Sequence, residues 1–503
     1  MSAAALFSSK TLTRDFTASI VVFLVAMPLC MGIAIASGVP PEKGLVTGII
    51  GGIVVGALAG SPLQVSGPAA GLAVLVFELV RDQGLSALGP ILILAGIFQF
   101  LAGVLRVGGW FRAISPAVVH GMLAGIGVLI VAGQFHVLFD ESPLPSGPEN
   151  LLAMPGRLLG LTFDNLEATE FAFAIALVTI GAMLGWEKFR PAALRLMPGA
   201  LVGVLAGTLL TILIGLPVVR VDVPESIVSA VVLPEPGLLA RLMTPSIIVT
   251  ALAIAFVASA ETLLSAAAVD RMHDGVRTNY DKELRAQGVG NLLCGVAGAL
   301  PMTGVIVRSS ANVQAGAMTR LSAMMHGVWI LGFVALLPWL LREIPMAALG
   351  AILVVVGWRL VSLSHVRHLF SRYGLMPAII WAATLIMVVA TDLLTGVLVG
   401  IGLSVLELVP HLRHLRLRVE QRPDGEGDAI ALTGAATFVT LPKLTKMLES
   451  VPKERAVRLD LSGLTAVDHT SAEMISEWSA RHKAGGGKVE LTDASGRFAA
   501  LAG

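Results

Sequence analysis

Apolar windows long enough to cross a lipid bilayer recur along most of this chain, from about Asp15 to Leu415. A transmembrane helix needs about 20 mostly apolar residues, so these windows constrain the fold more than any other feature. The composition agrees, because 55% of the 503 residues are hydrophobic and only 14% are charged. A water-soluble core cannot absorb this excess, which must therefore face lipid. We predict an all-α polytopic membrane domain.

The windows number about fourteen, and two of them are interrupted. The interrupted pieces are Val65–Val80, which opens on Ser66-Gly67-Pro68-Ala69, and Met302–Ala317, which carries Arg308. They stand third and tenth in chain order. The uninterrupted spans are expected near residues 15–37, 44–60, 85–105, 115–137, 170–186, 196–218, 245–267, 285–300, 319–341, 346–362, 374–391 and 393–412.

Charge in the loops predicts the orientation. Basic residues gather in alternate loops, as expected for a cytoplasmic N-terminus, while the loop after the fifth of the fourteen segments is acidic and is expected outside. The basic loops hold Lys188, Arg190 and Arg195, then Arg271, Arg277, Lys282 and Arg285, then Arg359, Arg367 and Arg372. Because seven places separate the interrupted pieces, each holds the same position in a seven-segment half. This predicts two inverted repeats, about 14–218 and about 245–415, within a membrane domain spanning 1–415.

The two interruptions predict where a solute binds. Glycine and proline inside a membrane segment free backbone groups that lipid cannot satisfy, and such a break is tolerated where it lines a cavity. A short helix follows each break, and two helix N-termini that face each other favour an anion. Arg308 adds a positive charge about one turn into the second short helix. The alternative is that Gly67 and Pro68 only kink a packed helix and that Arg308 reaches the interface.

Glu261 is a second candidate, because it stands deep in the apolar span 245–267. A carboxyl group in that setting can carry a proton. Ser265 follows one turn later on the same helix face. The alternative is a neutral, hydrogen-bonded carboxyl group that fixes helix packing.

After Leu415 the chain changes character, and a small cytoplasmic α/β domain is predicted over 416–503. We expect a polar linker at 416–426, strands at Ala429–Leu432 and Ala456–Leu461, and helices at Leu441–Ser450 and Ser471–Ala484.

Several functional classes are excluded by what the sequence lacks. A net charge of +1 gives no basic field for nucleic acid, and two cysteines in apolar stretches argue against a zinc site or a disulfide framework. No enzyme motif or nucleotide-binding loop is present, so ATP-driven transport by this chain is unsupported, and we expect no cofactor and no metal.

Three stretches resemble the SulP family of anion transporters. Val25–Gly38 resembles the proline-containing first helix of the family, and Ala299–Leu321 resembles its tenth-segment signature. Val457–Ile475 is similar to a STAS domain, which sulfate transporters share with anti-sigma-factor antagonists. The resemblance covers nearly the whole chain. It implies two inverted seven-segment repeats, divided into core and gate domains, and a cytoplasmic STAS domain.

The resemblance also implies that the substrate binds between the third and tenth segments. The implied binding residues are Ser66, Gly67, Pro68, Ala69, Val305, Ile306, Val307 and Arg308, and Glu261 matches the acidic position that the family associates with cation coupling. Two positions depart from sulfate-type members. Leu29 follows Pro28 where many have glutamine, and Val307 precedes Arg308 where many have serine. The pocket is therefore expected to be less polar than that of a sulfate binder, which favours bicarbonate or a small carboxylate.

Two further departures bear on coupling and regulation. Some bicarbonate carriers have aspartate and threonine at the places of Glu261 and Ser265, so proton coupling is expected in preference to sodium coupling. In the tail, Asp468-His469-Thr470-Ser471 replaces the D-S-S-G of phosphorylated STAS regulators. One interpretation makes Thr470 a phosphate acceptor. The other gives the domain a role in folding, dimer contact or partner binding.

These features together predict a secondary active transporter in a bacterial inner membrane. It would symport a small anion (a carboxylate or dicarboxylate, bicarbonate or sulfate) with a proton, and a homodimer is expected by resemblance. An anion exchanger and an anion channel with a regulatory tail are alternatives. A nucleobase permease can share this fold, but Arg308 and the STAS-like tail argue against it. A membrane-anchored signalling protein would have no reason to interrupt its helices.

Overall fold

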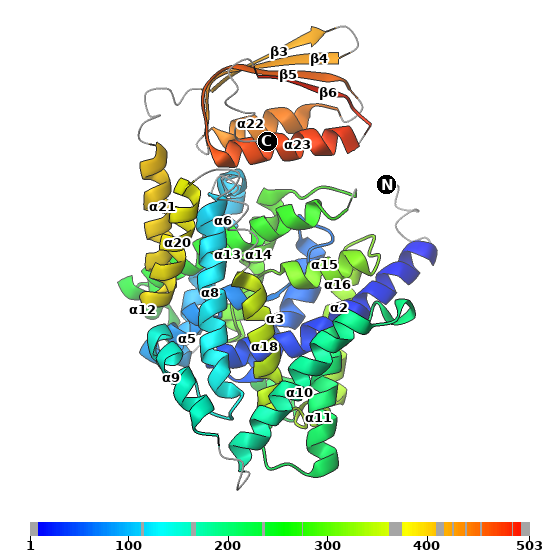
Figure 1. Cartoon of the computed structure of the whole chain (residues 1–503), viewed down its shortest axis with the longest axis vertical. Coiled ribbons are helices and arrows are strands. Elements are labelled where there is room, and N and C mark those ends of the chain that lie inside the picture. Colours follow the sequence, from blue (N-terminus) through cyan, green and yellow to red (C-terminus); the bar gives the residue numbers. More distant parts are fainter. Residues whose placement is uncertain are drawn as a thin grey trace. The chain divides into compact units, whose positions relative to one another are not determined.

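The computed structural model describes residues 9–111, 115–161, 167–233, 237–273, 275–361, 375–408, 417–424, 427–437, 440–452, 455–484 and 486–493. Helices make up most of this structure (Figure 1). Within these ranges, six helical segments are long and apolar enough to cross a membrane: Thr11–Ala36, Pro41–Leu58, Leu85–Val104, Pro116–Val137, Ala168–Phe189 and Pro245–Asp270. Five further helices of 10–17 residues are also apolar.

A helix lies in every uninterrupted window that the sequence predicts to span the membrane. These helices are α2 (Ser9–Ala36), α3 (Pro41–Ile50), α6 (Leu88–Val104), α8 (Pro116–Val137), α10 (Ala168–Phe189), α11 (Gly199–Ile214), α13 (Pro245–Asp270), α14 (Tyr280–Val296), α16 (Leu321–Leu336), α18 (Met346–Val361), α20 (Leu375–Ala390) and α21 (Leu393–Leu408). The second window is not a uniform helix, because α3 continues through a π-helical turn, Gly51–Val55, into α4 (Gly56–Leu58).

Both predicted interruptions are present. A short strand, β1 (Ser66–Pro68), precedes helix α5 (Ala70–Gln83), and a second, β2 (Met302–Gly304), precedes α15 (Ile306–Gln314). The two strands pair with each other in antiparallel register. The third and tenth segments are thus each a strand followed by a short helix.

Several short helices in the loops were not expected from hydropathy. They are α7 (Gly108–Phe111), α9 (Gly147–Leu159), α12 (Leu238–Leu242), α17 (Pro338–Leu341) and 3₁₀ turns at Leu85–Ala87, Ala192–Leu194 and Ile227–Ala230. The longest, α9, has a local cause. The hydroxyl of Ser146 accepts a hydrogen bond from the N–H of Glu149 at 3.3 Å, which caps the helix N-terminus.

Glycine lets α6 and α14 approach backbone to backbone. A Cβ atom on Gly96 of α6 would lie 2.4 Å from the amide nitrogen of Leu292, and one on Gly288 of α14 would lie 2.5 Å from that of Phe100. Helices in lipid have no hydrophobic driving force to associate. Small residues at such contacts allow close van der Waals packing, which stabilises the pair instead. The pair holds α14 close to the broken segments, since α14 contacts both β2 and the π-helical turn.

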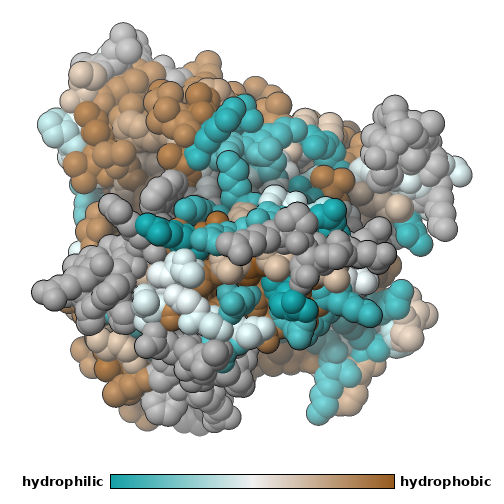
Figure 2. Space-filling view, turned by 90° about the horizontal axis from the view of Figure 1, so that it is seen from above, coloured by the Kyte–Doolittle hydropathy of each residue, from teal (hydrophilic) through white to brown (hydrophobic). Residues whose placement is uncertain are grey.

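Large apolar side chains remain exposed on several membrane helices, as a lipid-facing surface requires. Examples are Leu101 on α6, Leu177 on α10, Leu213 on α11, Ile386 on α20 and Leu398 on α21. Broad hydrophobic areas are also visible in the space-filling view (Figure 2).

The chain divides into two compact units, one of Met1–Gly108 with Ile126–Val361 and one of Gly109–Gly125 with Ser362–Gly503. The first contains both broken segments. The second contains α20, α21 and the C-terminal α/β domain. The boundary near residue 415 that the sequence suggests stays a prediction.

The C-terminal domain is a four-stranded sheet in the order β3-β4-β5-β6 (Figure 1). The strands are β3 (Leu417–Asp424), β4 (Gly427–Ala436), β5 (Val457–Val467) and β6 (Val489–Thr492); β3 pairs antiparallel with β4 and the rest are parallel. Helices α22 (Leu441–Ser450) and α23 (His469–Ala484) lie together on one face of the sheet (Figure 1). Leu444, Ile475 and Trp478 of these helices share one hydrophobic core with Leu459 of β5.

The sheet corrects two predictions made for this domain, one about a linker and one about the number of strands. Residues 417–424 form β3 and not a linker, because Leu417 and Val419 face the core while polar residues alternate with them. Strand β6 was not predicted, since only four residues pair there. The two predicted strands and two predicted helices are confirmed. Thr470 lies in the first turn of α23, and its side chain lies outside the described residues.

Candidate functional site

The two broken segments meet at one place. Ser66 pairs with Gly304, Gly67 with Thr303 and Pro68 with Met302. Because the strands are antiparallel, α5 and α15 leave the pair in opposite directions and both begin beside it. Their N-cap residues are extended, and neither helix is capped by a described side chain. Two helix N-termini with free N–H groups therefore flank the strand pair.

Side chains from neighbouring helices satisfy the backbone that the breaks expose. Asn291 of α14 accepts from the N–H of Met302 at 2.8 Å and donates to its carbonyl oxygen at 3.1 Å. The N–H of Gly304 donates to the hydroxyl of Thr262 at 3.1 Å, and that of Val65 donates to the hydroxyl of Ser309 at 2.9 Å. The interrupted backbone is therefore held in one conformation inside the membrane domain.

Arg308 is completely buried beside the first break. Its exposed fraction is 0%, and a Cβ atom on Gly67 would lie 2.0 Å from its Nη1 atom. All three guanidinium nitrogens are buried without a hydrogen-bond partner among the described residues. Cys30 and His326 are the neighbours with which its charge interacts. The side chain does not extend to the surface. A buried cation without a hydrogen-bond partner is energetically costly, and a bound anion would remove that cost.

Glu261 approaches the same region from α13. A Cβ atom on Gly71, the second residue of α5, would lie 2.6 Å from its Oε2 atom. That oxygen is buried and has no hydrogen-bond partner in the described part of the chain. That oxygen makes none of the helix-packing hydrogen bonds that the alternative interpretation invokes. Ser265, one turn further along, is also buried.

The other expected binding residues divide into two groups. Ser66, Gly67, Pro68 and Ala69 are buried at the strand pair and the start of α5. The hydroxyl of Ser66 accepts from Nε2 of Gln287 at 2.7 Å, so its own hydrogen is left to donate. On α15, Val305 is half-buried, while Ile306 and Val307 are 39% and 46% exposed. Only Arg308 of the second group lies with the buried cluster.

The polar face of α14 was not predicted from the sequence. Glu283, Gln287 and Asn291 are all fully buried there. Glu283 accepts from the N–H groups of Gly60 and Ser61 at 2.8 and 2.9 Å, and Gln287 donates to Glu283 at 3.0 Å. Their four-residue spacing was a usable signal, because it places three polar side chains on one face of the helix.

The structure therefore defines a class of protein: a membrane transporter built around two broken helices with a buried charge between their N-termini. The comparisons name its family. The Sulfate permease family model matches residues 12–384, and the chain belongs to that family. A second model, for the Mlab STAS domain, matches residues 419–502. The members of this family are transporters and not enzymes.

Sequence relatives agree with this assignment, and solved structures share the fold. YvdB of Bacillus subtilis (strain 168), a candidate sulfate transporter by name, is 28% identical over 491 residues, which cover 93% of this chain and 89% of YvdB. The bicarbonate transporter BicA of Picosynechococcus sp. is 24% identical over 84% of this chain and 75% of its own length. The transmembrane domain of a cyanobacterial BicA superposes with a TM-score of 0.67 at 24% identity, covering 78% of this chain and 98% of that domain. SLC26A9 gives 0.70 at 16% identity, covering 100% of this chain and 87% of that structure.

Proposed function

We propose that the protein is a secondary active transporter of small anions, with the anion bound between the N-termini of α5 and α15. The observation that carries this proposal is the buried guanidinium of Arg308, which lies against Gly67 and has no partner among the described residues. An anion there would accept hydrogen bonds from the guanidinium and from the free N–H groups of the two helix starts. The binding residues would be Ser66, Gly67, Pro68, Ala69, Val305, Ile306, Val307 and Arg308.

Charge at the site favours a monovalent anion carried together with a proton. The cluster holds one cation, Arg308, and one carboxyl group, Glu261, at the two sides of the first break. When Glu261 is protonated the pair carries one positive charge, which one monovalent anion neutralises. When Glu261 is ionised the positive charge is already offset, and the anion is released. Proton symport of bicarbonate or a small monocarboxylate follows from this balance, with sulfate and dicarboxylates less well matched.

The names of the relatives support the choice of anion class. YvdB is named for sulfate transport and BicA for bicarbonate transport, so both names support a small anion as the substrate. Here Leu29 and Val307 contribute apolar side chains at the positions of the first and tenth segments where polar ones would suit the more strongly hydrated sulfate. We therefore place bicarbonate or a small carboxylate ahead of sulfate.

The membrane setting is also part of the proposal. The basic loops support a cytoplasmic N-terminus and a cytoplasmic STAS domain in a bacterial inner membrane. Resemblance to the family supports a homodimer.

The test is uptake into liposomes that contain the purified protein. Labelled bicarbonate, acetate, fumarate and sulfate are compared with and without an inward proton gradient. Saturable uptake of one anion, stimulated by the gradient, is expected, and Glu261→Gln should remove the stimulation. Uptake that occurs only when anion is present on both sides would identify an exchanger. Conductance without saturation or counterflow would identify a channel.

A further inference from the structure

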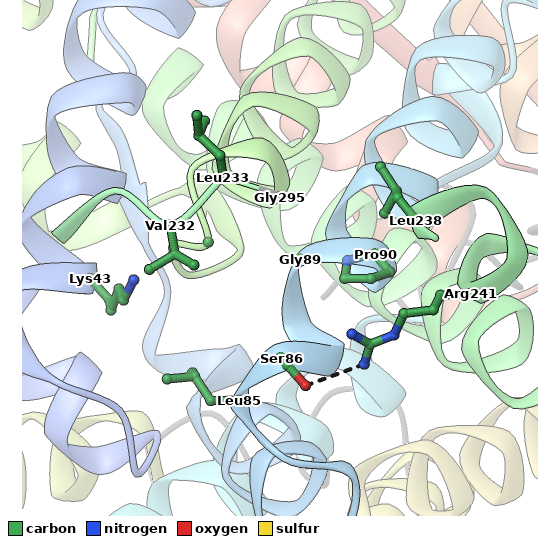
Figure 3. A pocket seen from close by; sticks show the side chains of 11 residues that line it. Lys43, Leu85, Ser86, Gly89, Pro90, Val232, Leu233, Leu238, Arg241 and Gly295 are labelled. Atoms are coloured by element: carbon green, nitrogen blue, oxygen red, sulfur yellow. Dashed lines mark hydrogen bonds between the residues drawn. The ribbon is translucent and has the colours of Figure 1, made fainter. Parts of the chain in front are cut away.

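A cavity lies outside the Arg308 site. It has a volume of about 290 Å³ and lies between Lys43 near the start of α3, the start of α6, the C-terminal end of α14 and the segment that joins the two repeats (Figure 3). Its walls include Leu85, Val232, Leu233 and Leu238, with Arg241 of α12. None of its described lining residues belongs to the cluster around Arg308.

Two cations face this cavity from opposite sides (Figure 3). Lys43 is only 4% exposed, and its Nζ atom donates at 2.7 Å to the carbonyl oxygen of Ala230. Arg241 donates from Nη2 to the hydroxyl of Ser86 at 3.3 Å. Both of these acceptors are neutral, and further donor positions remain on each cation. Glu42 interacts with the charge of its neighbour Lys43, but it does not line the cavity. None of the described lining residues is acidic.

The remainder of the wall is apolar and partly open to the outside. Leu85 is 39% exposed, Val232 56% and Leu233 68%. Pockets for small molecules combine such apolar walls with a few polar groups that fix orientation. The volume corresponds to about ten water molecules, at about 30 Å³ each. That space holds an anionic head group with a short apolar segment, and it is larger than a simple inorganic ion requires.

We propose that this cavity binds an amphipathic anion, a carboxylate or phosphate group that carries an apolar chain. The anionic group pairs with Arg241, and the chain lies along Leu85, Val232 and Leu233. Because the cavity is walled by α12 on one side and by α3, α6 and α14 on the other, its occupant ties the connecting segment between the repeats to helices that pack around the broken segments.

The experiment uses tritiated decanoate and the full-length protein in phosphatidylcholine nanodiscs, with empty nanodiscs subtracted. Saturable binding of one decanoate per chain is expected. Val232→Trp, which fills the cavity from an exposed position, should abolish it. Arg241→Gln should weaken it about tenfold, as expected for loss of a hydrogen bond to a charged group. Arg157→Gln is the matched control, because Arg157 pairs with Glu141 outside the cavity. It should bind decanoate as the unmodified protein does.

Competition identifies the source of the ligand. Displacement of decanoate by phosphatidylglycerol in the nanodisc would identify a membrane lipid. Retention of decanoate in its presence would identify a free amphipathic anion. Acetate should not compete, because it lacks the chain. Absence of saturable binding, or equal affinity in the unmodified protein, Val232→Trp and Arg241→Gln, would overturn the proposal.

Discussion

The change Gly67→Ala tests the contact between the first break and Arg308 with a single methyl group. The added Cβ would lie 2.0 Å from Nη1 and 3.2 Å from Cζ of Arg308. Ordinary contacts begin at 3.4 Å, so Nη1 must retreat by about 1.4 Å. The clashing atom is the far end of a flexible side chain, and the backbone around Gly67 need not move. The variant should therefore fold while its guanidinium is displaced.

The expected loss of anion affinity follows from the hydrogen bonds involved. One hydrogen bond to a charged group contributes about 1.5–3 kcal/mol, and every 1.4 kcal/mol is about a factor of ten in affinity. A guanidinium moved by more than an ångström loses at least one such bond to the anion. We expect the KM for the transported anion to rise about tenfold to a hundredfold.

The assay is the concentration dependence of uptake into proteoliposomes. Gly332→Ala is the matched control, since a Cβ there meets no atom within 4 Å. Thermal unfolding of the purified variants checks that both are folded. A Gly67→Ala protein that is folded and has an unchanged KM would refute the placement of the anion beside Arg308.

Three further predictions concern the surroundings of the site. Gly71→Ala places a Cβ 2.6 Å from Oε2 of Glu261 and should abolish stimulation by a proton gradient while anion exchange at equal pH persists; undiminished stimulation would count against Glu261 as the proton carrier. Asn291→Leu leaves the N–H and carbonyl of Met302 unpaired and should destabilise the protein by about 2–4 kcal/mol, seen as a lower Tm. Burial raises the pKa of Asp140, which follows α8, to about 6. Because this exceeds the value of about 3.9 in an unfolded chain, its contribution to stability is present below pH 4 and is lost as the pH rises through 6. The Tm of the unmodified protein should therefore fall relative to that of Asp140→Asn between pH 4 and 6, and a rise would contradict the argument.

The membrane helices could be predicted from sequence because lipid imposes a simple requirement. About 20 apolar residues are enough to identify a helix such as α13, whatever it packs against. Glycine and proline in Ser66–Ala69 likewise marked the first break, since lipid tolerates such residues only where another group satisfies the backbone. The strand pairing of the two breaks was not predictable, because it depends on contacts between residues more than 230 positions apart.

Contacts at the site could not be predicted from the sequence for the same reason. Arg308 could be selected as a buried charge, but its approach to Gly67 requires the packing of two separate segments. The π-helical turn at Gly51–Val55 gave no hydropathy signal. It lies where Gly51 packs against the carbonyl group of Ser66. A Cβ atom on Gly51 would lie 2.6 Å from that carbonyl oxygen. Strand β3 was not predicted because the exposed charged residues Arg418 and Glu420 made this stretch resemble a linker.

The most direct test of the account is an equilibrium titration of purified protein with the transported anion, followed by thermal unfolding. A ligand that binds only the folded state raises Tm, and the rise grows with the logarithm of the ligand concentration once that concentration exceeds Kd. The anion should stabilise the unmodified protein and Arg81→Ala, whose arginine is exposed beside Asp82 at the other end of α5. Arg308→Ala should fold but gain no stability from the anion, and Arg308→Lys should recover part of the effect. Equal stabilisation of Arg308→Ala and the unmodified protein would contradict the claim that this buried arginine holds the anion.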